Sequence, residues 1–396
     1  MRKFLYNIST VAFGNFFNAA LGFFYIAAVA KALTLEDFGK YSILSATLVG
    51  IAKLTDFGVN NVFVAKSITQ TDAIEKLRHQ FGGAKITLLV LAIFIGCLFI
   101  FSAGYREYSL LILFIIGVVG YSVNFSLFAL FQKEKLYIYA VALNTLPALI
   151  KGLIAIMLFF GFFNLSLFSA FAVFSLSICT SLILYTKLPE KHTLYSFPSK
   201  KTFELLRTAA PAGVSGLIGS SWSAIAAFIA KVFGTFSSAG IYSIADKIAN
   251  VFTLVSVSIS TVLLPNLAQS KLDNKRINKK KLGVLCILTA TMGLLTVGAT
   301  RVLFPIVFGD KFADSINLLD ILIIAASFTA IHNFLENYFF VEQATHKLAA
   351  ISLLKLTVFV AVAFSLMGTY GLTGLAIAQI SASTVALITI SVFIYR

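Results

Sequence analysis

Eight ionisable side chains interrupt long apolar stretches of this sequence, and they are the residues best placed to carry chemistry. They are four lysines together with three acids and a histidine: Lys53, Lys151, Lys247, Lys355, Asp56, Asp246, His332 and Glu336. If these stretches cross a membrane, each lysine at mid-bilayer costs about 2.5–3.5 kcal/mol on insertion scales. We therefore expect the lysines to face the protein interior or a wet space, away from lipid.

A buried ammonium group is suited to binding phosphate, because lysine acts as a point-charge partner for phosphate oxygens. Lys53 and Lys151 lie deep in their apolar segments, whereas Lys247 and Lys355 lie close enough to one end to extend toward the membrane surface. Internal pairing is the alternative interpretation, since Asp56 sits one turn from Lys53 and an aspartate directly precedes Lys247. The sequence leaves both interpretations open: diphosphate binding by the four lysines, and their neutralisation by acids.

His332 and Glu336 are spaced four residues apart, so they share one face of a helix. A histidine and a carboxylate in this arrangement can relay protons across a membrane. A polar contact between helices accounts for the same pair. We group both residues with Asp56 and Asp246 as charge partners or coupling residues, and leave coupling to H+ or Na+ open.

The composition indicates that membrane-spanning helices position these residues. Hydrophobic residues make up 59% of the chain and charged residues 12%, with a mean hydropathy of +0.94. A spanning helix needs about 20 mostly apolar residues, and the bilayer interior requires a hydrogen-bonded helical backbone. We therefore predict an all-α integral membrane fold with about 12 transmembrane helices. The predicted spans are 9–30, 41–64, 84–104, 109–131, 138–161, 165–185, 209–231, 240–264, 283–300, 316–340, 348–368 and 372–394.

Basic residues predict the orientation of these helices. With a cytoplasmic N-terminus, most lysines and arginines fall on the inside, including Lys66, Lys76, Arg78 and Lys85 after the second span. An excess of basic residues in cytoplasmic loops is the general rule for membrane proteins. We therefore place both termini in the cytoplasm. This distribution of basic residues explains the net charge of +15, so we do not infer binding to nucleic acid.

The chain also repeats itself. Residues 29–44 (VAKALTLEDFGKYSIL) match residues 229–245 (IAKVFGTFSSAGIYSIA), so that Gly39 aligns with Gly240. Two six-helix lobes related by such a repeat are typical of alternating-access transporters. We predict an N-terminal lobe over 1–185, a cytoplasmic connecting loop over 186–208 with an interfacial helix from Ser199 to Thr208, and a C-terminal lobe over 209–396.

Motifs of several enzyme classes are missing from the sequence. Residues 82–85 (GGAK) lack the spacing and the following serine or threonine of a phosphate-binding loop, so ATP hydrolysis is not expected. Neither a nucleophile elbow nor an HExxH motif occurs. Cys97, Cys179 and Cys286 are too scattered for a zinc site or a disulfide framework. We therefore predict a transporter without catalytic residues, metal or cofactor.

Five short segments carry a family resemblance. Residues 32–42 (ALTLEDFGKYS) and 54–58 (LTDFG) resemble the N-terminal signature of the O-antigen-type polysaccharide flippases. Residues 240–245 (GIYSIA), 264–265 (LP) and 308–312 (FGDKF) resemble the C-terminal half of the same proteins. These flippases belong to the multidrug/oligosaccharidyl-lipid/polysaccharide exporter superfamily, and the likeness extends over the whole chain.

This resemblance implies two six-helix bundles around a central cavity in the bacterial inner membrane. It implies that the substrate is an undecaprenyl-diphosphate-linked oligosaccharide, moved to the outer leaflet for surface polysaccharide such as the O-antigen of lipopolysaccharide. The implied partners are the lipid bilayer and a glycan polymerase or ligase. One position departs from the family: relatives often carry an acid six residues before the lysine matching Lys231, and Ile225 stands here. Any coupling role that this acid has in relatives is therefore not assigned to Ile225.

Two other classes of protein remain as alternatives to the flippase. A cation-coupled drug antiporter of the same superfamily would need a cavity lined by acids without matching lysines. A membrane-embedded glycan ligase or polymerase would need a large outer loop, whereas the longest outer loop predicted here is 301–315. The sequence favours the flippase and leaves the sugar, the coupling ion and the oligomeric state open.

Overall fold

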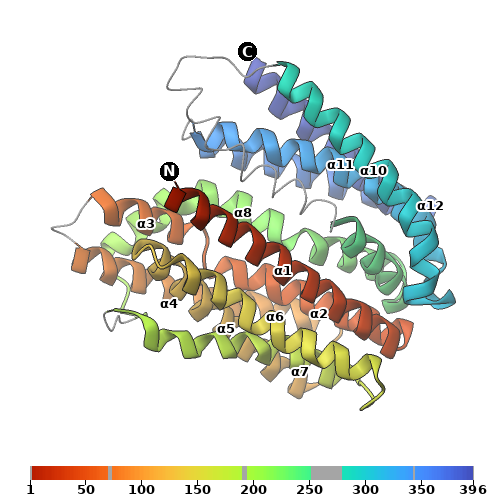
Figure 1. Ribbon diagram of the computed structural model, residues 1–396, viewed down its shortest axis with the longest axis horizontal. Coiled ribbons are helices and arrows are strands. Elements are labelled where there is room, and N and C mark those ends of the chain that lie inside the picture. The colour runs from red at the N-terminus through yellow and green to blue at the C-terminus, as the bar shows by residue number, and fades with distance from the viewer. Residues whose placement is uncertain (1, 70–73, 190–193, 251–278, 342–343, 396) are drawn as a thin grey trace. The chain divides into compact units, whose positions relative to one another are not determined.

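The computed structural model describes residues 2–69, 74–189, 194–250, 279–341 and 344–395 (Figure 1). Across these ranges the chain forms helices joined by short loops, and they contain no strand. The predicted all-α fold is therefore confirmed. The end of the predicted span 240–264 and the Leu264–Pro265 motif lie outside the described residues.

Thirteen helical elements follow one another along the described chain, and the predicted spans fall on them except where residues 55–58 interrupt the span 41–64. In chain order they are α1 (Arg2–Ala32), α2 (Leu35–Leu54), α3 (Val59–Thr69), α4 (Ile74–Ser102), α5 (Tyr108–Lys133), α6 (Tyr137–Phe159), α7 (Leu167–Ser177), the 3-10 helix η2 (Ile178–Lys187), α8 (Lys200–Phe233), α10 (Lys279–Phe308), the short 3-10 helix η3 (Asp310–Phe312), α11 (Asp314–Val341) and α12 (Thr345–Tyr395). Residues 236–250 are also helical. The last two predicted spans are joined within α12 at Gly371, whose φ of 53° interrupts the helix.

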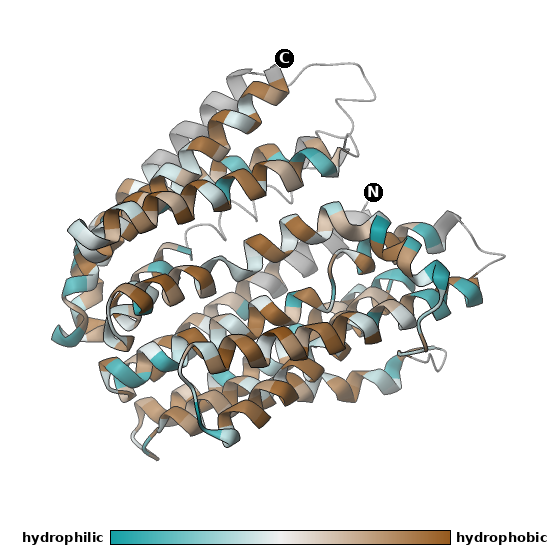
Figure 2. Cartoon of the chain, turned by 180° about the vertical axis from the view of Figure 1, so that it is seen from behind, coloured by the Kyte–Doolittle hydropathy of each residue, from teal (hydrophilic) through white to brown (hydrophobic). Residues whose placement is uncertain are grey.

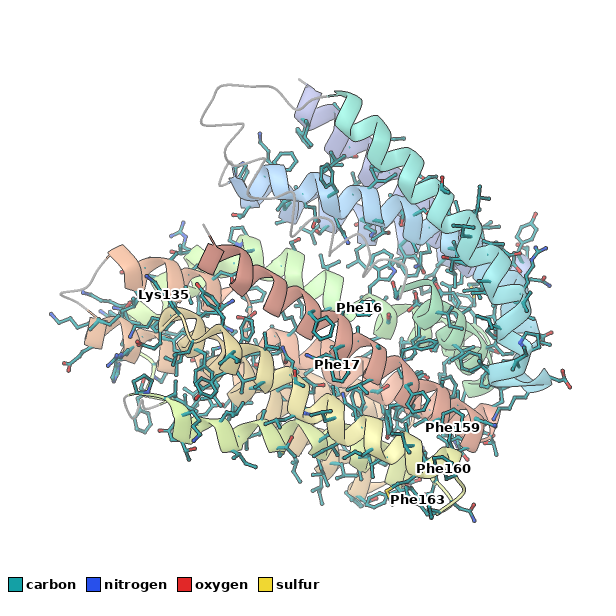
Figure 3. The ribbon with its side chains drawn as sticks, in the orientation of Figure 1. Phe16, Phe17, Lys135, Phe159, Phe160 and Phe163 are labelled. Atoms are coloured by element: carbon teal, nitrogen blue, oxygen red, sulfur yellow. The ribbon has the colours of Figure 1, made fainter. Side chains whose placement is uncertain are left out.

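Eight of the described helical segments are long and apolar enough to cross a membrane. Hydrophobic residues cover the middle of the helices, and hydrophilic residues gather toward their ends and in the loops (Figure 2). Large apolar side chains point outward: Phe16 on α1 is 60% exposed and Phe160, just after α6, is 75% exposed (Figure 3). A surface of this kind fits contact with lipid tails instead of water.

The chain divides into two compact units. Unit 1 holds Met1–Val29 and Tyr41–Ile225, and unit 2 holds Ala30–Lys40 and Ala226–Arg396. The predicted interfacial helix from Ser199 to Thr208 is not separate, because residues 200–208 form the first turns of the long helix α8. The predicted lobes 1–185 and 209–396 remain a prediction.

The segment that leads into α8 is packed firmly on unit 1. Ser196 Oγ donates a hydrogen bond of 2.5 Å to the carbonyl oxygen of His79 on α4, and Tyr195 Oη lies 3.0 Å from Ser122 Oγ on α5. Gly82 and Gly83 allow this approach, since a Cβ atom at Gly83 would lie 3.0 Å from Pro198 Cα. The connecting segment therefore belongs structurally to the N-terminal helices.

In unit 2 the two aligned glycines of the sequence repeat lie against each other. A Cβ atom on Gly240 would lie 2.7 Å from the carbonyl oxygen of Leu35 and 3.3 Å from the backbone nitrogen of Gly39. Lys311 stabilises the loop between α1 and α2, because its ammonium group donates hydrogen bonds to the carbonyl oxygens of Lys31 at 3.0 Å and Leu33 at 2.7 Å. The loop between α1 and α2 is therefore held within unit 2 by close backbone packing and a lysine cap.

Candidate functional site

The helix predicted over 41–64 is broken in the structure, and this break organises the candidate site. It ends at Leu54 as α2 and resumes at Val59 as α3, within one apolar span. Phe57 and Gly58 have φ angles of 37° and 74°, which a right-handed helix cannot contain. Irregular backbone at membrane depth requires protein or water around it. Residues 55–58 meet this requirement because they are buried or half-buried.

The break changes the hydrogen-bonding partners of the backbone. In a continuous helix the N–H of Val59 would donate to the carbonyl oxygen of Thr55. Instead, the Val59 N–H donates to the carbonyl oxygen of Asp56 at 2.8 Å. The Thr55 carbonyl oxygen therefore loses its ordinary helical partner and becomes an acceptor for another group.

Asp56 caps the beginning of α3. Its Oδ1 atom accepts a hydrogen bond from the backbone N–H of Asn60 at 3.2 Å. A carboxylate at a helix N-terminus is stabilised both by this bond and by the helix dipole. The Asn60 amide in turn donates to the carbonyl oxygen of Phe125 at 2.9 Å and so ties the start of α3 to α5.

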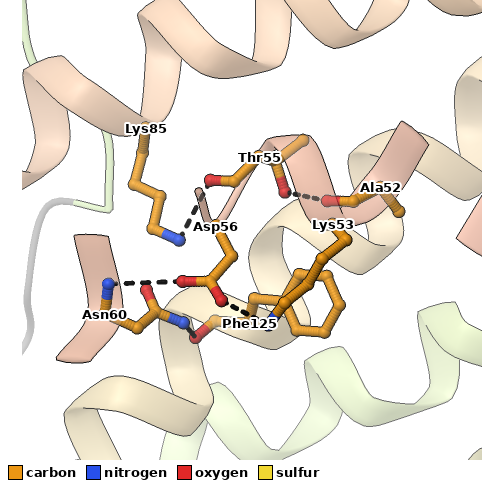
Figure 4. Close-up of polar contacts among 7 residues, drawn as sticks. All are labelled: Ala52, Lys53, Thr55, Asp56, Asn60, Lys85 and Phe125. Atoms are coloured by element: carbon orange, nitrogen blue, oxygen red, sulfur yellow. Dashed lines mark hydrogen bonds and ion pairs between the residues drawn. The ribbon is translucent and has the colours of Figure 1, made fainter. Parts of the chain in front are cut away.

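Lys53 and Asp56 form an ion pair across the break, with 2.5 Å between Nζ and Oδ2 (Figure 4). The sequence predicted these two residues to be candidate partners. The Lys53 side chain is 32% exposed, whereas the Asp56 side chain is 8% exposed. The Lys53 ammonium group also lies over the Phe125 ring, 5.3 Å from its centroid.

A second lysine, Lys85, completes the site. Its ammonium group donates a 3.2 Å hydrogen bond to the Thr55 carbonyl oxygen that the helix break leaves free (Figure 4). The Lys85 residue is fully buried on α4, and its charge acts on the Asp56 carboxylate. The sequence counted Lys85 among the basic residues on the cytoplasmic side, whereas the structure buries it within α4. The reason is that α4 begins at Ile74, ten residues before the predicted start of that span at residue 84.

The cluster of Lys53, Asp56 and Lys85 carries an excess of positive charge, because Lys53 pairs with Asp56 and the charge of Lys85, held at Thr55, also acts on that carboxylate. Helix α8 passes beside it through two glycines. A Cβ atom at Gly213 would lie 2.5 Å from the carbonyl oxygen of Phe57, and one at Gly216 would lie 3.7 Å from Lys53 Cε. The absence of a side chain at Gly213 therefore lets α8 approach the break, and Gly216 places no side chain against Lys53.

Lys151, also predicted as a phosphate contact, lies on α6 apart from this cluster. Its ammonium group is 5.1 Å from the centroid of the Phe174 ring on α7. The described part of the chain gives it no ion pair. Lys151 is half-buried. The interaction that the structure shows for its charge is this cation–π contact with Phe174.

In unit 2, Asp246 and the half-buried Lys247 follow Tyr242 along the helical residues 236–250. The Gln379 amide on α12 donates to Asp246 Oδ1 at 3.5 Å, and the Tyr242 hydroxyl donates to Gln379 Oε1. The predicted acid is therefore buried in a chain of polar groups that the sequence did not indicate.

The predicted His332–Glu336 pair is present on α11, with 3.5 Å between Nδ1 and Oε1. Lys355 on α12 interacts electrostatically with both residues. The sequence treated Lys355 as a separate phosphate contact, whereas the structure brings it to this pair. Among the residues the structure describes, no group of histidines, cysteines and acids is arranged to hold a metal ion.

Comparison with known proteins gives one family match. A model of the family described as "Polysaccharide biosynthesis protein" matches residues 4–271, more than half of the chain. The search among curated proteins found no match.

Solved structures with the same fold are multidrug and related transporters. The chain aligns with outward-facing and inward-facing structures of a multidrug resistance MATE family transporter of the MOP superfamily at TM-scores of 0.64 and 0.62. Identities are 14% and 16%, over 98% of this chain and 94% and 93% of those chains. A MOP superfamily transporter from Pyrococcus furiosus, reported with a binding pocket of reverse polarity that suggests a different function, aligns at a TM-score of 0.63 and 13% identity, covering 98% of this chain and 95% of that one. These alignments establish a shared fold.

Proposed function

The chain belongs to the polysaccharide biosynthesis protein family, and we propose that it is a flippase for a lipid-linked oligosaccharide. It is a multi-pass membrane transporter with the fold of the MOP superfamily. Its proposed substrate is an undecaprenyl-diphosphate-linked oligosaccharide, which it moves from the cytoplasmic to the outer leaflet by alternating access. The family description supports the glycan part of this substrate, and the charge of the site supports the diphosphate part.

The observation that carries the proposal is the excess positive charge at the break between α2 and α3. Broken membrane helices form substrate and ion sites in many transporters. Here the ammonium group of Lys53 belongs to a side chain that is one-third exposed, beside an aspartate that Lys85 also neutralises. A diphosphate brings two or more negative charges and several acceptor oxygens, which match a partly accessible lysine with charge in excess.

The other buried lysines extend this proposal to further stages of transport. Lys151 has a ring contact and no described ion pair, so its ammonium group is also suited to a phosphate. Lys247 and Lys355 lie beside Asp246 and Glu336, and we assign them the same role at later positions of the substrate. Asp246, His332 and Glu336 are then the charge partners or coupling residues.

A cation-coupled drug antiporter is the second candidate, because the multidrug transporters share the fold. The charge of the site argues against it. A cationic drug approaching Lys53 would meet a cluster in which lysines outnumber acids, and like charges repel it. We therefore keep the antiporter as the alternative that the experiment must exclude.

The proposed setting follows from the substrate. An undecaprenyl-diphosphate carrier places the protein in the bacterial inner membrane, with both termini cytoplasmic by the distribution of basic residues. The lipid bilayer is its medium, and a glycan polymerase or ligase on the outer face would consume its product. Surface polymers such as O-antigen are the proposed destination.

Complementation tests the proposal. The full chain is expressed in cells that lack their own glycan flippase, and surface polymer is measured by immunoblot. Restored polymer with the wild-type chain, and none with Lys53→Gln at equal membrane abundance, supports the flippase. Efflux of a cationic dye without any surface polymer would favour the antiporter.

A further inference from the structure

We propose that Lys85 is the permanent counter-ion of Asp56 and that Lys53 exchanges between Asp56 and the phosphate of the substrate. This inference rests on the proposed function and assigns different tasks to the two lysines. Lys85 is a positioning residue that never touches the substrate. Lys53 is the binding residue, and Lys85 compensates the charge of Asp56 so that Lys53 can leave it and bind phosphate.

Lys85 is fixed in place by the break between α2 and α3. It is fully buried, and its ammonium group donates to the Thr55 carbonyl oxygen at 3.2 Å. This oxygen lies at the C-terminal end of α2, where the helix dipole favours a positive charge. A lysine so held is shielded from a substrate, while its positive charge still acts on Asp56.

Asp56 lies within the break and is held by the start of α3. Its Oδ1 atom accepts from the Asn60 N–H at the beginning of α3. The positive end of the α3 dipole therefore adds to the effect of Lys85. The carboxylate remains compensated by a hydrogen bond, a helix end and a buried ammonium group when Lys53 departs.

Lys53 is the most exposed member of the cluster. Its side chain is 32% exposed, against 8% for Asp56 and complete burial for Lys85. On the α8 side Gly216 places no side chain against it, and a Cβ atom built there would lie 3.7 Å from Lys53 Cε. Lysine has a flexible four-carbon stem, so rotation of the stem can carry its ammonium group from Asp56 to a ligand.

The net charge of suitable variants distinguishes two hypotheses: that Lys53 alone binds phosphate, and that only the net charge of the cluster matters. The cluster has a charge of +1 in the wild type and zero in Lys85→Met or Lys53→Met. Adding Asp56→Asn returns each single variant to +1. If only the net charge matters, both double variants recover binding. If Lys53 alone touches phosphate, recovery occurs only in the double variant that retains Lys53.

The experiment measures equilibrium binding of farnesyl diphosphate to the purified full-length chain in nanodiscs, with farnesol as the uncharged control. We expect Lys85→Met to weaken binding about tenfold, because Lys53 is then held by Asp56. Lys85→Met/Asp56→Asn should bind within about threefold of the wild type, since Lys53 is released again. Lys53→Met and Lys53→Met/Asp56→Asn should both bind farnesyl diphosphate no better than farnesol. Lys85→Gln, which keeps an N–H donor for Thr55, repeats the test if Lys85→Met fails to fold.

Two results would overturn the inference while leaving the flippase proposal intact. One is equal recovery of both double variants, which would mean that charge alone governs binding. The other is a Lys85→Met/Asp56→Asn protein that stays as weak as Lys85→Met, which would mean that Lys85 contacts the phosphate itself. A wild-type chain that binds farnesyl diphosphate no better than farnesol would instead overturn the proposed function.

Discussion

Lys85 Nζ lies 3.2 Å from the carbonyl oxygen of Thr55, thirty residues earlier in the chain. In several transporters with broken helices, carbonyl oxygens of this kind coordinate a bound cation. Here a lysine of the protein itself supplies the cation. The positive charge at the break is therefore built into the fold, and Asp56 is compensated before any substrate arrives.

The first prediction concerns Lys53 in the cell. Lys53→Gln should abolish complementation of a flippase-deficient strain, because the partly exposed ammonium group is lost. The exposed Lys201 on α8 offers a matched control with the same change of charge. Surface polymer, normalised to membrane abundance, is the measurement. Equal polymer from both variants would remove Lys53 from the site.

The second prediction concerns the cap at Asp56. Asp56→Ala should lower the free energy of unfolding by about 1–2 kcal/mol through loss of the α3 cap, with an added cost from two uncompensated lysines. Asp56→Asn should lose less, because asparagine caps a helix as well as aspartate does. Thermal unfolding in detergent measures both. Identical losses in the two variants would show that the cap contributes nothing.

The third prediction uses two glycines on α8 that are six residues apart. A Cβ atom at Gly213 would lie 2.5 Å from the Phe57 carbonyl oxygen, whereas a Cβ at Gly219 meets nothing within 4 Å. Gly213→Ala should therefore lower the melting temperature. Gly219→Ala should leave it unchanged or raise it, since alanine favours a helix over glycine by about 1 kcal/mol. The reverse order would contradict the close approach of α8 to the break.

The fourth prediction concerns the contact between the two copies of the repeat, where Gly240 packs against the backbone of residues 35–39. Gly240→Ala places a Cβ atom 2.7 Å from the Leu35 carbonyl oxygen, so folding yield and melting temperature should fall. Gly298→Ala on α10 is the control, because a Cβ there has no neighbour within 4 Å. Fluorescence-detected size-exclusion after heating compares the two. A Gly240→Ala protein as stable as the control would mean that the backbone at Leu35 can move to accommodate the added Cβ atom.

The positions of the helices could be predicted from the sequence because a bilayer imposes both a length and an apolar composition on each span. The Lys53–Asp56 pair was also predictable, since residues three apart on a helix are neighbours. The His332–Glu336 pair followed from the same rule. These features depend on local spacing, which a sequence displays directly.

The rest of the site depends on contacts between distant segments. Lys85 precedes an apolar run, and a lysine there is ordinarily a loop residue; its burial follows from the ten extra residues at the start of α4. The approach of Lys355 to Glu336 joins α12 to α11 and has no local signature. The break after Leu54 did leave a signal, because the sequence TDFG combines a turn-forming aspartate with a glycine that adopts positive φ.

Reconstitution tests the central claim most directly. The full-length chain is placed in liposomes that contain a polyprenyl-diphosphate-linked oligosaccharide in both leaflets, and the sugar accessible to an impermeant glycosidase is measured over time. The account predicts that all of the sugar becomes accessible with the wild-type chain. Only the outer-leaflet share should become accessible with Lys53→Gln or with empty liposomes. Wild-type liposomes that behave as the empty ones do would contradict the account.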